Sequence, residues 1–160
     1  MLDIKDCPKV QSFNDGSLPS NLKEMCLNNC SKLIASLKRA LGANPLLKIM
    51  EVGKLDMEAF PKEGLLPLSL TCLQINEIED LKSVDYKGLC SLSSLKELFI
   101  NDCPKLQCLS EEGLPKSISR IVISGNCPLL EERQLSITSG RSAQIHFSQE
   151  FLGEKSGAAY

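Results

Sequence analysis

Eight cysteines and one histidine are the side chains of this sequence best suited to bind a metal, form disulfides or act as nucleophiles. They are Cys7, Cys26, Cys30, Cys72, Cys90, Cys103, Cys108, Cys127 and His146. A zinc site needs close cysteine pairs with further ligands, and the nearest pairs, Cys26/Cys30 and Cys103/Cys108, have no such companions. Disulfide frameworks are typical of short secreted domains, and the first residues lack the layout of a signal peptide. We therefore expect no metal site and reduced cysteines.

The sequence also offers no set of residues that forms a catalytic site. His146 is the only imidazole, so a Cys-His or Ser-His-Asp arrangement would need a residue distant in the sequence to approach it. Paired carboxylates occur at Glu111-Glu112 and Glu131-Glu132, but adjacent turn positions are far more often solvated than catalytic. We expect no enzymatic activity and no residue that binds a cofactor.

The spacing of the cysteines instead indicates an internal repeat. Cys7 and Cys30 are 23 residues apart, and Cys103 and Cys127 are 24 residues apart. An L-x-x-L-x-L pattern recurs at steps of 23 or 25 residues, which lies within the range of leucine-rich repeats. Its copies are Leu22/Met25/Leu27, Leu47/Met50/Val52, Leu70/Leu73/Ile75, Leu95/Leu98/Ile100 and Ile118/Ile121/Ile123, with a truncated copy at Leu2/Ile4.

Stacked units of this kind predict the fold. The last two apolar residues of each copy are two positions apart, so on a strand they point to one face, and stacking joins them into a continuous core. We predict an α/β repeat solenoid: a leucine-rich-repeat horseshoe arc of about six units, with a parallel β-sheet on the concave face and a mostly irregular convex side. Only the second repeat, around residues 36–41, resembles a helical turn.

Two segments follow from the extent of the repeats. Residues 1–133 are predicted to form the solenoid, with a truncated first repeat. Residues 134–160 are predicted to be a non-repeat tail or cap, either a hairpin around residues 138–141 or a frayed end.

A row of small side chains follows the predicted strands. We expect these cysteines to be buried, reduced and inert, because small thiols fit where the chain turns away from a strand. They are Cys7, Cys30, Cys103 and Cys127. Leu55 and Ile78 take the same place in the third and fourth units. Cys26 and Cys72 fall at outward-facing strand positions, where we expect exposed thiols.

Composition restricts the class of partner. Eighteen basic and twenty acidic residues give a formal net charge of −2, without the basic excess that binding to nucleic acid requires. No apolar run approaches the roughly 20 residues that a membrane span needs. We expect a protein partner, and neither nucleic acid nor membrane.

The outward-facing strand positions are the predicted protein-binding surface on the concave face. The candidate residues are Glu24, Cys26, Asn28, Ile49, Glu51, Cys72, Gln74, Asn76, Glu97, Phe99, Asn101, Arg120, Val122 and Ser124. Phe99 and Val122 should be neighbours on adjacent strands, and an aromatic side chain among polar ones is the usual composition of a binding hot spot. Glu97 and Arg120 should also lie side by side, where an exposed ion pair influences partner choice more than stability.

Three phrases of the sequence resemble a known family. They are LKELFINDCPKL at residues 95–106, EGLPKS at 112–117 and NCPLL at 126–130. Over about residues 2–133 the chain resembles the C-terminal leucine-rich repeats of plant coiled-coil-type nucleotide-binding leucine-rich-repeat (NLR) disease-resistance proteins. The resemblance implies a recognition module of a cytoplasmic plant immune receptor, which senses pathogen effectors, restrains the receptor and leads to a defence response. The implied partner is a pathogen effector, a guarded host protein or the receptor's own nucleotide-binding module.

The sequence departs from that family in three respects. It has no G-x-x-x-x-G-K-[ST] phosphate loop, so ADP or ATP is expected only in an upstream module. It begins inside a repeat, which suggests a fragment of a longer protein or a truncated gene product. Residues after Arg133 do not match the usual family ending.

Other functions remain open from the sequence alone. A segment of an extracellular leucine-rich-repeat receptor would agree with the Asn29-Cys30-Ser31 sequon and the number of cysteines. A stand-alone leucine-rich-repeat adaptor and a decayed gene fragment are further alternatives.

Overall fold

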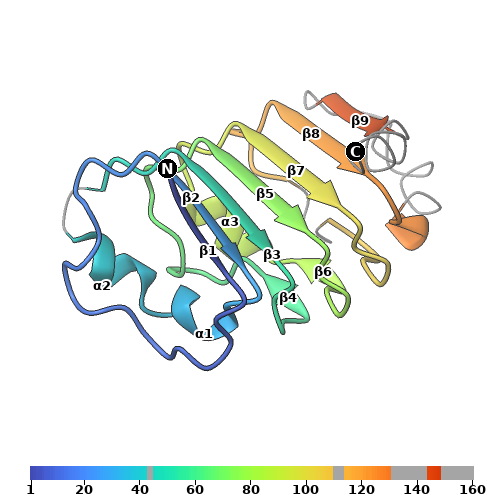
Figure 1. Ribbon diagram of the computed structural model, residues 1–160. Helices are drawn as coiled ribbons and strands as arrows, with labels where there is room; N and C mark the ends of the chain where they lie inside the picture. The colour runs from blue at the N-terminus through green and yellow to red at the C-terminus, as the bar shows by residue number, and fades with distance from the viewer. Residues whose placement is uncertain (43–44, 110–113, 131–143, 149–160) are drawn as a thin grey trace, which may run out of the picture.

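Parallel strands dominate the computed structural model, which describes residues 1–42, 45–109, 114–130 and 144–148. Within these residues one sheet contains seven strands that all run in the same direction (Figure 1). In order across the sheet they are β1 (Leu2–Lys5), β2 (Glu24–Asn28), β3 (Ile49–Gly53), β5 (Cys72–Asn76), β7 (Glu97–Asn101), β8 (Arg120–Ser124) and β9 (Gln144–Ser148). Spatial order follows chain order, so each unit of the sequence repeat adds one strand beside the previous one.

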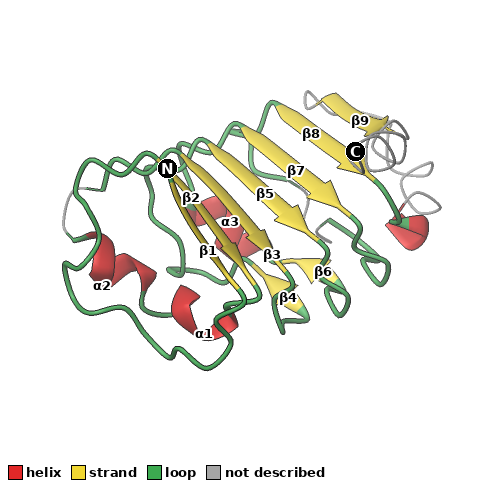
Figure 2. Ribbon diagram, in the orientation of Figure 1, coloured by secondary structure: helices red, strands yellow, loops and turns green. Residues whose placement is uncertain are grey.

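The segments between these strands hold short elements (Figure 2). The labelled helices are α1 (Ser31–Ile34), α2 (Leu37–Leu41) and α3 (Tyr86–Ser91), and residues 128–130 are also helical. β4 (Ala59–Phe60) pairs with β6 (Ser83–Val84) in a small second sheet. α2 lies where a helical turn was predicted. α3 corrects the expectation that only the second repeat would be helical. Its start is stabilised by Asp85, whose carboxylate accepts a hydrogen bond from the Gly88 amide at 3.1 Å.

The apolar column predicted from the sequence forms the core. All fifteen residues of the five L-x-x-L-x-L copies are buried, and the most exposed of them, Leu22, retains 7% of its surface. Leu2 and Ile4 of the truncated copy are partly buried against the same core. Burying a side chain of this size is worth about 1.5–3 kcal/mol, so the column is the main stabilising feature of the sheet. A mostly parallel sheet with few helices is compatible with the predicted α/β repeat fold.

In the seven-stranded sheet, each strand from β1 to β8 is followed by a residue with the same backbone conformation. The residue after the strand has a φ between 48° and 55° at Asp6, Asn29, Lys54, Glu77 and Asp102, and of 67° at Gly125. The backbone amide of this residue continues the hydrogen bonds between neighbouring strands. For example, the Asn29 amide donates to the Gly53 carbonyl at 3.0 Å. Asparagine, aspartate and glycine tolerate this left-handed region well, whereas Lys54 and Glu77 hold it against a steric cost of about 1–2 kcal/mol.

The row of cysteines lies directly after these turns. Cys30, Cys103 and Cys127 are buried, as predicted, and all eight cysteines of the chain are free. The Cys103 amide donates to Sγ of Cys127 at 3.4 Å, and the Cys127 thiol reaches the Ser124 carbonyl at 3.6 Å. The thiols therefore satisfy backbone groups of the turns. Cys7 is only half-buried, contrary to expectation, because its unit forms the edge of the described sheet.

The end of the described chain differs from the prediction. Residues 134–160 were expected to form a hairpin or a frayed end, but β9 pairs with β8 in parallel and in register, with Ile145 opposite Ile121 and Phe147 opposite Ile123. The two residues of each pair are 24 positions apart in the sequence, so residues 144–148 continue the repeat. The predicted boundary at 133/134 and the turn at 138–141 lie outside the described residues.

Candidate protein-binding surface

The outward-facing side chains form three rows in the predicted register. The first row is Glu24, Ile49, Cys72, Glu97 and Arg120; the second is Asp3, Cys26, Glu51, Gln74, Phe99 and Val122; the third is Lys5, Asn28, Gly53, Asn76, Asn101 and Ser124. Parallel pairing without a shift produces this arrangement, because each strand enters the sheet at the same position of its repeat. The rows contain the fourteen candidate residues together with Asp3, Lys5 and Gly53, and the binding role of the candidates stays a prediction.

An aromatic, an aliphatic and a charged side chain meet near the C-terminal end of this face. Phe99 and Val122 are paired neighbours, as predicted, and both are half-buried. Arg120 lies over the Phe99 ring, with its guanidinium carbon 5.6 Å from the ring centre. The same guanidinium is 3.7 Å from a carboxylate oxygen of Glu97. The arginine thus presents an apolar stacking surface and a paired charge at one place, which suits recognition of a protein side chain.

His146 extends this cluster and was missed as a residue of the concave face. In β9 it pairs with Val122 and is exposed, so it continues the second row beyond Phe99 and Val122. The sequence contained a signal for it, since Ile145 and Phe147 repeat the alternation of Ile121 and Ile123 after 24 residues. We define the aromatic patch as Glu97, Phe99, Arg120, Val122 and His146.

Polar side chains predominate in the N-terminal half of the face. Asn76 donates to a Glu51 carboxylate oxygen at 2.8 Å across adjacent strands. Within β1, the Lys5 ammonium nitrogen lies 2.9 Å from an Asp3 carboxylate oxygen. At Gly53 an added β-carbon would lie 2.6 Å from Nδ2 of Asn28, so the asparagine side chain occupies the space above the glycine. These side chains bind one another and leave the aromatic patch as the main apolar feature of the three rows.

The two cysteines on this face are not exposed, which corrects the prediction. Cys26 retains 6% and Cys72 retains 8% of its surface, because the small thiols lie among longer neighbours on closely spaced strands. Burial, followed by the nearby carboxylates of Glu51 and Asp3, raises the pKa of Cys26 to about 11. Burial and the Glu97 carboxylate raise the pKa of Cys72. Both thiols are protonated at neutral pH.

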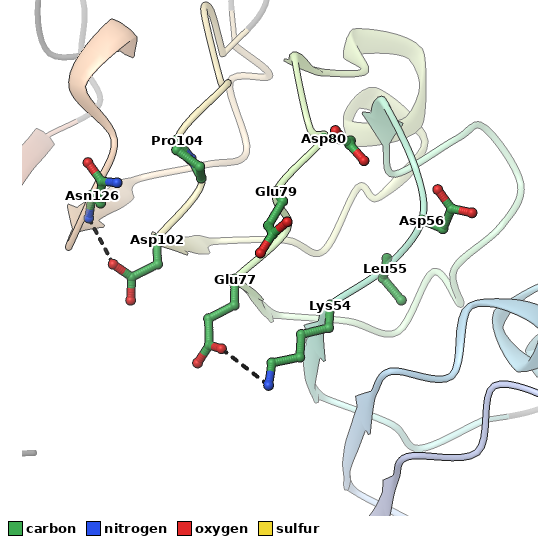
Figure 3. A pocket seen from close by; sticks show the side chains of 9 residues that line it. All are labelled: Lys54, Leu55, Asp56, Glu77, Glu79, Asp80, Asp102, Pro104 and Asn126. Carbon is green, nitrogen blue, oxygen red and sulfur yellow. Dashed lines mark hydrogen bonds and ion pairs between the residues drawn. The ribbon is translucent and has the colours of Figure 1, made fainter.

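A second surface feature lies at the ends of the strands, where the turns carry mainly acidic side chains. A groove of about 570 Å³ is lined there by Lys54, Leu55, Asp56, Glu77, Glu79, Asp80, Asp102, Pro104 and Asn126 (Figure 3). Lys54 pairs with Glu77 at 3.6 Å, and Asp102 accepts a hydrogen bond from the Asn126 amide at 2.8 Å. These contacts join turns of successive units. Glu77 and Asp102 therefore connect the units, a role that the L-x-x-L-x-L pattern did not indicate.

Comparison with known proteins gives one informative match. Over 119 residues the sequence is 38% identical to a protein of Arabidopsis thaliana named putative disease resistance protein. The chain is thus similar to part of a plant disease resistance protein. The match covers 73% of the chain and 8% of that relative, so the chain spans a small fraction of the plant protein's length. No family model matches the sequence, and no solved structure matches it.

Two searches of the described part of the chain complete the description of its surface. Among the described residues no three histidine, cysteine, aspartate or glutamate side chains lie together as a metal site would require. Within the same residues no helix combines the length and the apolar character needed to cross a membrane.

Proposed function

We propose that the chain is a leucine-rich-repeat segment of a plant immune receptor of the coiled-coil NLR class, and that it binds proteins without catalysing a reaction. The similarity to a plant disease resistance protein carries the proposal. The parallel sheet and its apolar column support it, because units of 23–25 residues stacked in register are what a leucine-rich-repeat solenoid requires.

Binding is proposed to occur on the concave sheet, centred on the aromatic patch. Phe99 and Arg120 offer an apolar and a cationic surface that a partner can cover. The partner is a pathogen effector, a guarded host protein or the receptor's own nucleotide-binding module. The receptor would act in the cytoplasm, and ADP or ATP would bind in that other module, with no cofactor in this segment.

The extracellular alternative is less well supported. Asn29 of the sequon donates from Nδ2, the atom that would carry a glycan, to Asp6 at 3.1 Å, and its neighbour Cys30 is buried. Titration of thiols in the unfolded protein distinguishes the two cases. Eight reactive thiols would exclude disulfides, whereas fewer would favour an oxidised, secreted protein.

The proposal is tested with the full receptor expressed in leaves together with its effector. Phe99→Glu should abolish the effector response or release the receptor from autoinhibition, because it replaces the ring at the centre of the aromatic patch with a charge. Leu129→Glu is the matched control, since Leu129 is 39% exposed and lies outside the three rows. A Phe99→Glu receptor that accumulates normally and responds like the wild type would refute the proposed surface.

A further inference from the structure

Leu46 and Leu68 are half exposed in the turns that lead into β3 and β5. These turns lie at the opposite ends of the strands from the groove that Glu77 and Asp102 line. Leu46 retains 49% and Leu68 retains 54% of its surface. Together with Lys38, Pro45 and Pro67 they line a groove of about 430 Å³. The groove lies between α2 and the turns that precede β3 and β5, and none of its lining residues belongs to the concave rows. A hollow lined by exposed leucines is typical of a binding site.

The walls of this apolar groove are held in place by the core. Leu47 and Leu70, which follow the two turns, are fully buried, and the Ser69 hydroxyl donates to the Leu47 carbonyl at 2.6 Å. Pro45 and Pro67 have a fixed φ, which restricts the backbone on both sides. The leucines are thus exposed on a preformed surface, so a ligand would not have to order it first.

The charge beside the apolar groove is positive. Lys38 is the only ionisable side chain among the described lining residues. Its neighbour Arg39 lies 3.6 Å from Asp15, whereas Lys38 makes no ion pair within the described part of the chain. Lys23 and Lys48, the residues directly before β2 and β3, are exposed on the same edge of the sheet. A carboxylate at the groove would therefore find a cation without a competing partner.

We propose that the apolar groove docks a short acidic segment of a protein partner, with a leucine-like side chain between Leu46 and Leu68 and a carboxylate on Lys38. The lining favours an aliphatic side chain over a phosphate chain, which would need several lysines at the contact. This site goes beyond the concave surface, so one partner could bind the aromatic patch while another protein segment binds here.

Fluorescence anisotropy with the 160-residue chain tests the site. The probe is a fluorescein-labelled peptide in which two leucines alternate with glutamates. Leu68→Ser and Lys38→Glu should each weaken binding by about tenfold, because one removes the apolar contact and the other reverses the charge. The matched controls are Leu129→Ser and Lys9→Glu, at exposed residues outside the groove, which should bind like the wild type. Circular dichroism verifies that every variant is folded.

Two further probes decide the class of ligand. A peptide with serine in place of both leucines should bind at least about tenfold more weakly, and added salt should weaken binding of the first peptide. Equal affinities of the wild type, Leu68→Ser and Lys38→Glu for the leucine peptide would overturn the proposal. So would binding to phosphatidylserine vesicles or single-stranded RNA that exceeds binding to the peptide and is lost in the same variants.

Discussion

Arg120 lies over the ring of Phe99 on the neighbouring strand, with its guanidinium carbon 5.6 Å from the ring centre, and also approaches Glu97 at 3.7 Å. All three side chains meet because β7 and β8 pair without a shift. The relationship depends on spacing alone: Glu97 and Arg120 are 23 residues apart, as are Phe99 and Val122. Regular spacing of the repeat therefore assembles the aromatic patch from side chains distant in the sequence.

The Arg120–Glu97 pair should contribute little to stability. Both side chains are largely exposed, at 53% and 41%, so water screens their attraction. A double-mutant cycle with Arg120→Ala and Glu97→Ala should give a coupling of no more than about 1 kcal/mol in urea unfolding, and less at high salt. A coupling above about 2 kcal/mol would show that the pair is held more rigidly than the structure indicates.

Leu98→Ala should be strongly destabilising, by about 2–5 kcal/mol in urea unfolding. Leu98 is fully buried in the apolar column, and truncation would leave a cavity in the core that the hydrogen-bonded strands cannot close. Leu129→Ala is the control, because Leu129 is 39% exposed and should change stability by less than about 1 kcal/mol. Similar losses for the two variants would contradict the common dry interior on which the fold depends.

Gly125→Ala should destabilise the protein by more than Gly16→Ala does. Both glycines have a positive φ, of 67° and 65°, so both substitutions carry the backbone cost of about 1–2 kcal/mol. Only at Gly125 would the added carbon also press on Asp102, whose carboxylate accepts from the Asn126 amide. Thermal unfolding of the two variants measures the difference, and equal melting temperatures would show that Asp102 moves aside at no cost.

Buried thiols should react slowly in the native protein. Cys90 is exposed, whereas burial raises the pKa of Cys26 to about 11, so at pH 8 Cys26 holds roughly 100-fold less thiolate than an ordinary cysteine. A thiol reagent should modify Cys90 first, and should modify all eight cysteines only after unfolding. Rapid modification of a Cys90→Ser variant at Cys26 would contradict this order.

Stability should fall at alkaline pH, partly through Cys103. Burial raises the pKa of this thiol from 9.0 to about 12, so the folded protein keeps a proton that the unfolded chain loses. The contribution is fully present below pH 9 and is lost as the pH rises toward 12. In urea unfolding at successive pH values, Cys103→Ala should show a shallower decline above pH 9 than the wild type. Identical slopes would mean that Cys103 is not the group responsible.

Features that the sequence missed depend on neighbours in space. Cys26 and Cys72 occupy outward positions, but their burial follows from the size of the side chains on the adjacent strands. The ion pairs between turns, such as Lys54–Glu77, have no fixed pattern within one repeat. α3 is the exception, because its cap at Asp85 is local in the sequence but is not part of the shared repeat pattern.

The sequence by itself determined the apolar column, the register of the three rows and the neighbours Phe99 and Val122. It could do so because a repeat of nearly constant length, stacked in parallel, converts positions in the sequence directly into positions in space. Only the tertiary structure decided that Cys26 and Cys72 are buried and that Leu46 and Leu68 flank a groove beside Lys38. The burial of the thiols depends on the size of the side chains on adjacent strands, and the groove depends on how turns of unequal length pack, and neither is periodic.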